Sequence, residues 1–534
     1  MVNKEKSDRR PQRNAYCQCL MTILIFIRRL YDSAIDLIFG FIYSSTEVKK
    51  LPPPSNDLVK ESAVSLAKKI RNKEITSEAV VGAFIQRIKE VNDIVNAVVQ
   101  DRFERALEDA KAVDRLIASG SVSPDDFNKK PLLGVPFTSK ESVAAEGMLW
   151  SCGMLSRKGT KAVEDADIVK SLKSAGAILI AVTNIPELNM WIECRNYVYG
   201  QTNNPYNTNR IVGGSSGGEA CIVSCCGSPI GLGTDIGGSA RLPAYFCGVY
   251  GHKLTGGLVN TKGMSFRDGT EKDTIVAAGG LLKHAADLKV VNLALVLPEK
   301  IPLLRLNEEI NAKKFNYFFV EQPGDRLSSP IGSECNNALL RVVRLIKEHS
   351  GFDNSPQKAH FPGFKYSFRL WKYWMSKELN NFAKDLANQE EPRSAFIELP
   401  KKLVGKSDHT LAAILKLVDQ HLPLPNASWA EEETATLRND LIKKLGDNGI
   451  LLFPSYASTA PYHYVPFFRP FNFSTWAIFN VLKFPVTQIP IGLSKDGLPL
   501  GIQIVAAPYQ DKLCFAAAEY IESLTGGWVP PFSS

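Results

Sequence analysis

The stretch from Gly213 to Pro243 reads GGSSGGEACIVSCCGSPIGLGTDIGGSARLP, and the rest of the chain can be interpreted around it. Two glycine-rich turns flank a short apolar segment; one turn holds Ser215 and Ser216, and the other runs into Ser239. Glycine lets the backbone approach a ligand closely, and successive N–H groups in such turns can bind an anion. The pattern indicates a serine nucleophile beside an oxyanion site, although each turn alone is also typical of an ordinary loop.

The overall composition is that of a globular protein. The chain has 534 residues, of which 45% are hydrophobic and 22% charged, enough for one large domain or a few smaller ones. A net charge of +8 is dispersed outside the N-terminus and does not indicate nucleic-acid binding. The ten cysteines include no CxxC pair, so neither a disulfide framework nor a zinc site is expected, and a reducing, intracellular compartment fits best.

Residues 1–50 are predicted to form a basic leader followed by an apolar, amphipathic segment that associates with membrane. Arg28 and Arg29 interrupt the apolar residues, so no run reaches the roughly 18 uncharged residues that a spanning helix needs. A helix in the lipid interface is one interpretation, and a helix docked on the protein's own core is the other. Cys17 and Cys19 are interpreted as unpaired structural cysteines, with S-acylation as the alternative, and the sequence leaves open which membrane is meant, the endoplasmic reticulum and lipid droplets being two candidates.

The prolines of LPPPS predict a linker over 51–57, followed by a single domain over 58–534. Helical spacing predicts about three helices before Gly120. Beyond it, the strand-like runs LLGVPF, AILIAV and PIGLGT alternate with helical stretches, which predicts an α/β fold with a central mixed sheet covered by helices.

Two apolar stretches lie in the more helical part of the chain. Phe368, Trp371, Trp374 and Met375 have helical spacing, which is more typical of core packing than of a binding site. The segment 411–425 is apolar and ends on prolines; it is either a second lipid-facing patch or a lid over a cleft.

The spacing of Gly213, Ser215 and Gly217 matches the GxSxG nucleophile elbow of the α/β-hydrolases. Its context argues against that fold, because the preceding segment is polar and rich in turns where a buried strand is required. The histidines give no better support. His252 is too close in sequence to Ser239 to be the late histidine of that fold.

A serine without a histidine still needs a base. Lys140 ends the apolar run LLGVPFTSK, where burial would lower the pKa of its ammonium group and allow it to act as a neutral amine. A surface lysine is the alternative interpretation.

GGSSGGEA, followed by GTDIGGSARLP and preceded by GVPFTSKE, resembles the motifs of the amidase signature family, and the similarity extends over residues 58–530. The resemblance implies a Ser–cis-Ser–Lys triad with Ser239 as nucleophile, Ser215 as bridging serine and Lys140 as base. It also implies supporting groups. The oxyanion would be bound by backbone N–H groups of Ile236, Gly237, Gly238 and Ser239; Ser216 is expected to hydrogen-bond near Lys140, and Asp235 and Arg241 to hold the loop. No metal or organic cofactor is expected.

Together with the apolar N-terminus, the resemblance implies hydrolysis of fatty-acid amides to a fatty acid and an amine through an acyl-enzyme. One alternative is a glutamine amidotransferase subunit, which would not need an apolar N-terminal helix. Another is a non-catalytic lipid-binding protein with the same fold, which would not need Lys140, Ser215 or Ser239. The expected partners are a fatty-acid amide and membrane lipid, without nucleic acid; the oligomeric state stays open, and a homodimer is compatible with the sequence.

Overall fold

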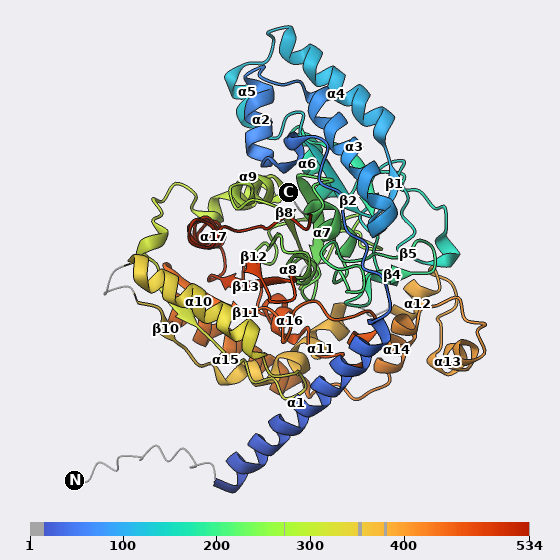
Figure 1. The fold of residues 1–534 in the computed structure, drawn as a ribbon, viewed down its shortest axis with the longest axis vertical. Coiled ribbons are helices and arrows are strands. Elements are labelled where there is room, and N and C mark those ends of the chain that lie inside the picture. Colours follow the sequence, from blue (N-terminus) through green and yellow to red (C-terminus); the bar gives the residue numbers. More distant parts are fainter. Residues whose placement is uncertain (1–14, 272, 351–354, 379–381, 533–534) are drawn as a thin grey trace.

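A mixed β-sheet forms the centre of the body in this computed structural model, which describes residues 15–271, 273–350, 355–378 and 382–532 (Figure 1). Within those residues the sheet has eleven strands in the order β1-β3-β2-β6-β8-β7-β12-β13-β11-β9-β10. The strands are β1 (Val98–Asp101), β2 (Pro136–Lys140), β3 (Ile178–Thr183), β6 (Ile230–Asp235), β7 (Tyr250–Lys253), β8 (Ala277–Leu282), β9 (Asn316–Phe319), β10 (Gln357–Lys358), β11 (Gly449–Pro454), β12 (Val486–Leu493) and β13 (Pro499–Val505). A separate pair consists of β4 (Arg195–Asn196) and β5 (Gly200–Gln201).

The sheet combines parallel and antiparallel pairs, as the alternating runs predict. β2 is parallel to both β3 and β6, whereas β6 is antiparallel to β8. Every residue of β2, β3, β8 and β11 is buried, as expected for strands covered on both faces. The expectation of an α/β body with a central mixed sheet is therefore confirmed.

Helices cover the sheet on both sides (Figure 1). Three of them, α2 (Ala63–Arg71), α3 (Ser77–Val95) and α4 (Phe103–Ala118), precede Gly120 as predicted. The other α-helices are α1 (Ala15–Tyr43), α5 (Pro124–Lys129), α6 (Asp167–Ser174), α7 (Gly217–Ser224), α8 (Arg241–Phe246), α9 (Asp287–Leu295), α10 (Ser333–Ser350), α11 (Ser367–Glu378), α12 (Phe382–Leu386), α13 (Ala395–Leu403), α14 (Leu411–Asp419), α15 (Ala427–Leu445), α16 (Ser474–Val481) and α17 (Asp511–Thr525). Short 3₁₀ helices are η1 (Asp57–Lys60), η2 (Leu155–Arg157), η3 (Glu187–Asn189), η4 (Pro298–Leu304), η5 (Ala312–Lys314), η7 (Pro362–Tyr366) and η8 (Val465–Phe468).

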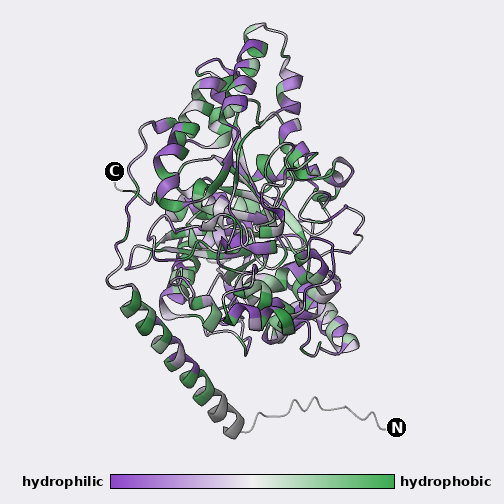
Figure 2. Cartoon of the chain, turned by 90° about the vertical axis from the view of Figure 1, so that its right-hand side faces the viewer, coloured by the Kyte–Doolittle hydropathy of each residue, from purple (hydrophilic) through white to green (hydrophobic). Residues whose placement is uncertain are grey.

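Helix α1 extends away from the body, and Figure 2 shows its described part as mostly hydrophobic. Near its C-terminal end Ile35 and Phe39 are buried against Val465, and Asp32 pairs with Arg469 at 3.1 Å. Part of this helix thus docks on the protein's own body. The other large apolar side chains of residues 22–42 are exposed: Ile23, Leu24, Ile25, Phe26, Ile27, Leu30, Tyr31, Leu37, Ile38, Phe41 and Ile42.

No helix among the described residues is long and apolar enough to cross a bilayer. Residues 1–14 and the side chains of residues 15–21 lie outside the described part, so the expectations for the basic leader and for Cys17 and Cys19 are not addressed. The chain joins the main core at Leu51, which is buried at the start of the proline-rich segment.

The apolar segment 411–425 begins as α14, whose two faces differ. Its inner face packs Ala413 and Leu417 against Phe382 and Leu386 of α12. Its outer face and the residues that follow are exposed: Leu411, Leu415, Leu422 and Leu424.

Candidate active site

Three loops and strand ends bring the predicted catalytic residues together. Lys140 is the last residue of β2, Ser215 precedes α7, and Ser239 lies between β6 and α8. Because β2 and β6 run parallel, their carboxyl ends meet at the same edge of the sheet. Ser215 is buried, and Ser239 is half-buried.

Lys140 is fully buried, and its Nζ makes two short contacts with hydroxyl groups. It lies 2.6 Å from Ser215 Oγ and 2.9 Å from Thr234 Oγ1. Burial lowers the pKa of Lys140 to about 7, against the opposing attraction of the Asp235 carboxylate. A large fraction of this lysine is therefore a neutral amine at physiological pH, as a general base must be.

Ser215 follows a cis peptide bond from Gly214. The neighbouring Ser216 donates its backbone N–H to the Ser239 carbonyl at 3.0 Å, which ties the two serine loops together. The Ser216 hydroxyl donates to the Thr234 carbonyl at 3.4 Å. The second hydroxyl beside Lys140 is thus that of Thr234, a residue that sequence reasoning missed.

Asp235 holds the loop that carries Ser239. Its carboxylate accepts the backbone N–H groups of Gly238 at 2.8 Å and Ala240 at 3.1 Å, and it forms a bidentate pair with Arg241, in which both distances are 3.0 Å. Burial alone would raise the pKa of Asp235, but the Arg241 guanidinium holds it well below its usual range. The loop is therefore fixed by a charged pair buried in the same segment.

The four N–H groups expected to bind an oxyanion are not equivalent in the structure. That of Gly238 is engaged by Asp235. Those of Ile236, Gly237 and Ser239 have no hydrogen-bond partner among the described residues. Gly238 has a φ of +107°, and a side chain there would meet Trp476 at 2.4 Å, so only glycine fits this turn.

Glu219 of α7 lies behind Lys140 and was also missed. It is fully buried and accepts hydroxyl hydrogen bonds from Thr138 at 2.7 Å and from Thr183 at 2.6 Å. Burial raises the pKa of Glu219 to about 8, so the carboxyl is largely neutral at pH 7. Its signal in the sequence is an acidic residue inside an otherwise apolar and glycine-rich helix.

Comparison with known proteins places this site in a family. A match to the amidase family spans residues 79–515. The chain belongs to the amidase family. It is 42% identical over 520 residues to fatty-acid amide hydrolase 2-A of Danio rerio, covering 95% of this chain and 97% of that protein. It is 38% identical over 524 residues to fatty-acid amide hydrolase 2 of Homo sapiens, covering 96% and 97%.

A solved structure of fatty acid amide hydrolase superposes with a TM-score of 0.70 at 22% identity, over 92% of this chain and 89% of that one, which shows a common fold. The family match and the relatives together make this chain an enzyme that hydrolyses amides.

A cavity of about 470 Å³ opens over both serines of the amidase. Its apolar wall consists of Leu188, Met190, Ile236, Met264, Phe266, Val276 and Phe382. Besides Ser215 and Ser239, its polar lining residues are Asn189, Thr234, Asp235, Ser265, Arg267, Glu271, Glu378, Asp385 and Gln389. The cavity can therefore accept a substrate with an apolar portion and a polar portion.

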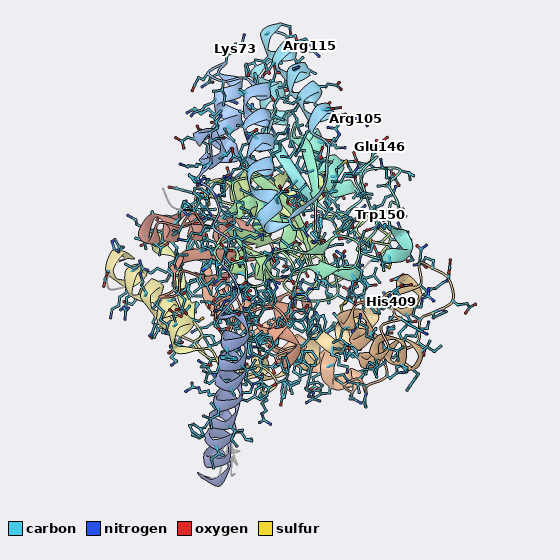
Figure 3. All side chains as sticks on the ribbon, turned by 45° about the vertical axis from the view of Figure 1, so that its right-hand side comes forward. Lys73, Arg105, Arg115, Glu146, Trp150 and His409 are labelled. Carbon is cyan, nitrogen blue, oxygen red and sulfur yellow. The ribbon has the colours of Figure 1, made fainter. Side chains whose placement is uncertain are left out.

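The cavity wall is anchored to the surface helix α14. His409, labelled in Figure 3, lies with Nδ1 2.8 Å from Oε1 of Glu187, and the Thr410 N–H donates to the other oxygen at 2.7 Å. Glu187 directly precedes Leu188 and Asn189, which line the cavity. The α14 N-terminus and one wall of the cavity are thus held by the same carboxylate.

Proposed function

We propose that this amidase hydrolyses fatty-acid amides through an acyl-enzyme, with Ser239 as nucleophile, Ser215 as proton relay and Lys140 as base. The observation that carries the proposal is the 2.6 Å contact between Lys140 Nζ and Ser215 Oγ. It lies in a buried site where the pKa of the lysine is about 7.

Acylation begins with Lys140 as a neutral amine. One of its N–H bonds is directed at Thr234, and its lone pair takes the hydroxyl proton of Ser215. Ser215 in turn takes the proton of Ser239, whose oxygen forms a bond to the amide carbonyl carbon. The carbonyl electron pair moves to oxygen, and the resulting oxyanion accepts the free N–H groups of Gly237 and Ser239.

The same relay then runs in reverse. Lys140, now an ammonium, returns its proton through Ser215 to the leaving nitrogen as the C–N bond breaks. The amine departs and leaves an ester on Ser239. A water molecule next gives one proton to the relay and attacks the ester carbon, the bond to Ser239 breaks, and the serine recovers its proton as the fatty acid is released.

Two observations support a fatty acyl group. Apolar side chains, Ile236 among them, line the cavity that contains Ser239, and the relatives with the identities given above are named as fatty-acid amide hydrolases. A long acyl chain is scarcely soluble in water, so an enzyme that uses it benefits from direct access to a lipid phase.

We further propose that the exposed apolar side chains of α1 and α14 contact an intracellular membrane. Both helices lie in the lower half of Figure 1. Each inserted methylene contributes about 0.8 kcal/mol, so a few of the side chains give reversible binding. Arg28 and Arg29 would lie near anionic headgroups, each worth about 1 kcal/mol.

Replacement of Ser239 by alanine tests the chemistry. The purified enzyme should hydrolyse oleamide and become labelled at Ser239 by a fluorophosphonate. Ser239→Ala should not be labelled at this position, and its rate of oleamide hydrolysis should be lower by a factor of about 10⁴ or more. Unimpaired labelling and turnover in this variant would overturn the assignment. Activity on glutamine without activity on oleamide would favour an amidotransferase subunit, and no activity on either would favour a non-catalytic lipid-binding protein.

Charge substitution on the exposed face of α1 tests the membrane contact. Leu37 and Phe41 are 75% and 82% exposed, so Leu37→Glu with Phe41→Glu leaves the docked Ile35 and Phe39 in place. We expect weaker co-sedimentation with vesicles and a several-fold higher KM for oleamide, with little change for a short soluble amide. Val163→Glu is the matched control, because Val163 is 91% exposed on a loop far along the chain. Full vesicle binding by the α1 variant would contradict the proposal.

A further inference from the structure

Trp371 of α11 contacts the nucleophile loop without lining the cavity. Its indole N–H donates to the carbonyl oxygen of Ile236 at 3.1 Å, across 135 residues of sequence. Its ring is packed edge-on against Phe473, with centroids 4.7 Å apart. Trp371 is mostly buried, so its orientation is set by the apolar cluster around it.

The hydrogen bond from Trp371 fixes the peptide group between Ile236 and Gly237, which carries both the Ile236 carbonyl and the Gly237 N–H. In a trans peptide the C=O and N–H bonds point to opposite sides, so fixing the Ile236 carbonyl also fixes the direction of the Gly237 N–H. That N–H has no partner in the described part of the chain. It therefore points away from Trp371 and is free to bind another acceptor.

The free N–H of Ser239 is fixed in the same way but by a different group. The carbonyl of Gly238 accepts the backbone N–H of Leu242 at 2.7 Å, which fixes the direction of the Ser239 N–H. Leu242 belongs to α8, so this bond forms as part of a helix turn. The Gly237 donor is fixed by a side chain that comes from another element.

Glycine at position 237 lets the Trp371 indole approach the Ile236 carbonyl, and it also makes the orientation of this peptide group depend on Trp371. A Cβ on Gly237 would lie 3.1 Å from Trp371 Nε1, so the absence of a side chain lets the indole approach. Glycine has the widest range of backbone conformations, and its peptide can rotate unless another group holds it. Among the described residues, the Trp371 indole is the only hydrogen-bond donor to the Ile236 carbonyl oxygen.

We propose that Trp371 is a positioning residue of the reaction, which orients the Gly237 N–H toward the developing oxyanion. The inference rests on the proposed function, in which Ser239 attacks and the oxyanion forms beside Gly237. An oxyanion donor contributes only when it is aligned before the reaction, and its loss typically lowers kcat by a factor of about 10² to 10³. Misalignment of one donor, with the other free donors still in place, should have a smaller effect.

Trp371→Phe tests the proposal because it removes the N–H and keeps an aromatic ring. We expect kcat for oleamide to fall by a factor of about 10 to 100 while KM changes by less than about twofold. A long-chain trifluoromethyl ketone, which forms a tetrahedral oxyanion with the nucleophile, should bind more weakly by the same factor. Inhibition by the product oleate, which has no tetrahedral carbon, should be unchanged.

Trp374→Phe is the matched control. Trp374 lies on the same helix and donates its indole N–H to Thr434 Oγ1 at 3.0 Å, away from the nucleophile loop. This variant should lose a similar amount of stability and keep its kcat. Equal kcat losses in the two variants, or an unchanged kcat in Trp371→Phe, would overturn the proposal.

A second variant covers the case in which Trp371→Phe folds poorly. The benzothiophene analogue of tryptophan at position 371 replaces N–H by sulfur and preserves the size of the ring, so the same loss of kcat is expected at native stability. Ser239→Ala distinguishes the positioning role of Trp371 from the proposed function of the enzyme. If Ser239→Ala is inactive while both Trp371 variants keep full kcat, the positioning role fails and the proposed function stands.

Discussion

Lys140 and Lys253 occupy similar environments and differ in what they touch. Both lie in strands of the same sheet, both are buried, and burial lowers the pKa of each to about 7. Lys140 Nζ meets two hydroxyl groups, those of Ser215 and Thr234, which line the cavity. Lys253 Nζ donates to the backbone carbonyl of Leu254 at 3.1 Å.

The difference shows that a lowered pKa alone does not make a catalytic base. For Lys253 the nearby Arg241 cation adds to the effect of burial, whereas the Asp235 carboxylate opposes both. The amine that results has no hydroxyl to deprotonate among the contacts described for it. Catalysis needs the neutral amine and a relay that reaches the cavity, and in this pair of residues Lys140 alone has both.

The largest expected effect comes from removing each lysine in turn. Lys140→Ala should lower kcat/KM for oleamide by a factor of about 10³ or more, because Ser215 then has no base. Lys253→Met should change it by less than about tenfold. The measurement is steady-state hydrolysis by each purified variant, with folding checked by circular dichroism. Comparable losses of kcat/KM in both variants would contradict the conclusion that Lys140, and not Lys253, is the catalytic base.

The next effect is the pH dependence of the rate. Because Lys140 must be neutral, kcat/KM should fall about tenfold per pH unit below pH 7 and level off above pH 8. Lys253→Met should keep this inflection within about half a unit. A profile from pH 5.5 to 9 on both proteins is sufficient. If the inflection disappears in Lys253→Met, the titrating group is Lys253 and not Lys140, which contradicts the prediction.

The smallest effect is one in which the two lysines should be alike. Each folded pKa is about 7, below the value near 10.4 of an unfolded lysine, so between these values the unfolded chain binds more protons. The free energy of unfolding should therefore rise with pH over this window, by about 1 kcal/mol per unit for each lysine. Below pH 7 this pH-dependent contribution to the free energy of unfolding should be lost completely. Urea unfolding at pH 7, 8 and 9 should show a similar flattening in Lys140→Met and Lys253→Met, and unequal flattening would show that the two are not equally buried.

Much of the central fold could be predicted because its strands and helices correspond to apolar runs and to periodic spacing of apolar residues in the sequence. The runs AILIAV and PIGLGT correspond to β3 and β6, and the helices before Gly120 follow their periodicity. The run LLGVPF overlaps β2 only at Pro136 and Phe137, because its first residues form a turn that leads into the strand. Lys140 could be proposed as a base from its place at the end of an apolar run. Its contact with Ser215 is implied only by the resemblance to a known family, since no spacing in the sequence shows that residues 75 apart will meet.

The missed contacts all depend on long-range packing. Thr234 looks like an ordinary strand residue until the pairing of β6 with β2 places its hydroxyl beside Lys140. Trp371 has the spacing of a core residue, which agrees with its burial, but its bond to Ile236 has no local signal. Likewise, the apolar face of α1 could not reveal that part of it would pack on Val465.

The way in which Asp235 holds its loop separates two tasks that the chain performs. The nucleophile is fixed by a pair of residues six positions apart, Asp235 and Arg241, and by glycine turns in the same segment. Most of the other residues that line the cavity walls come from other segments, among them η3 and α12. Substitutions in those walls can change which acyl chains or amines fit without moving the serine. Such an enzyme can diversify its substrates during evolution while its chemistry stays the same.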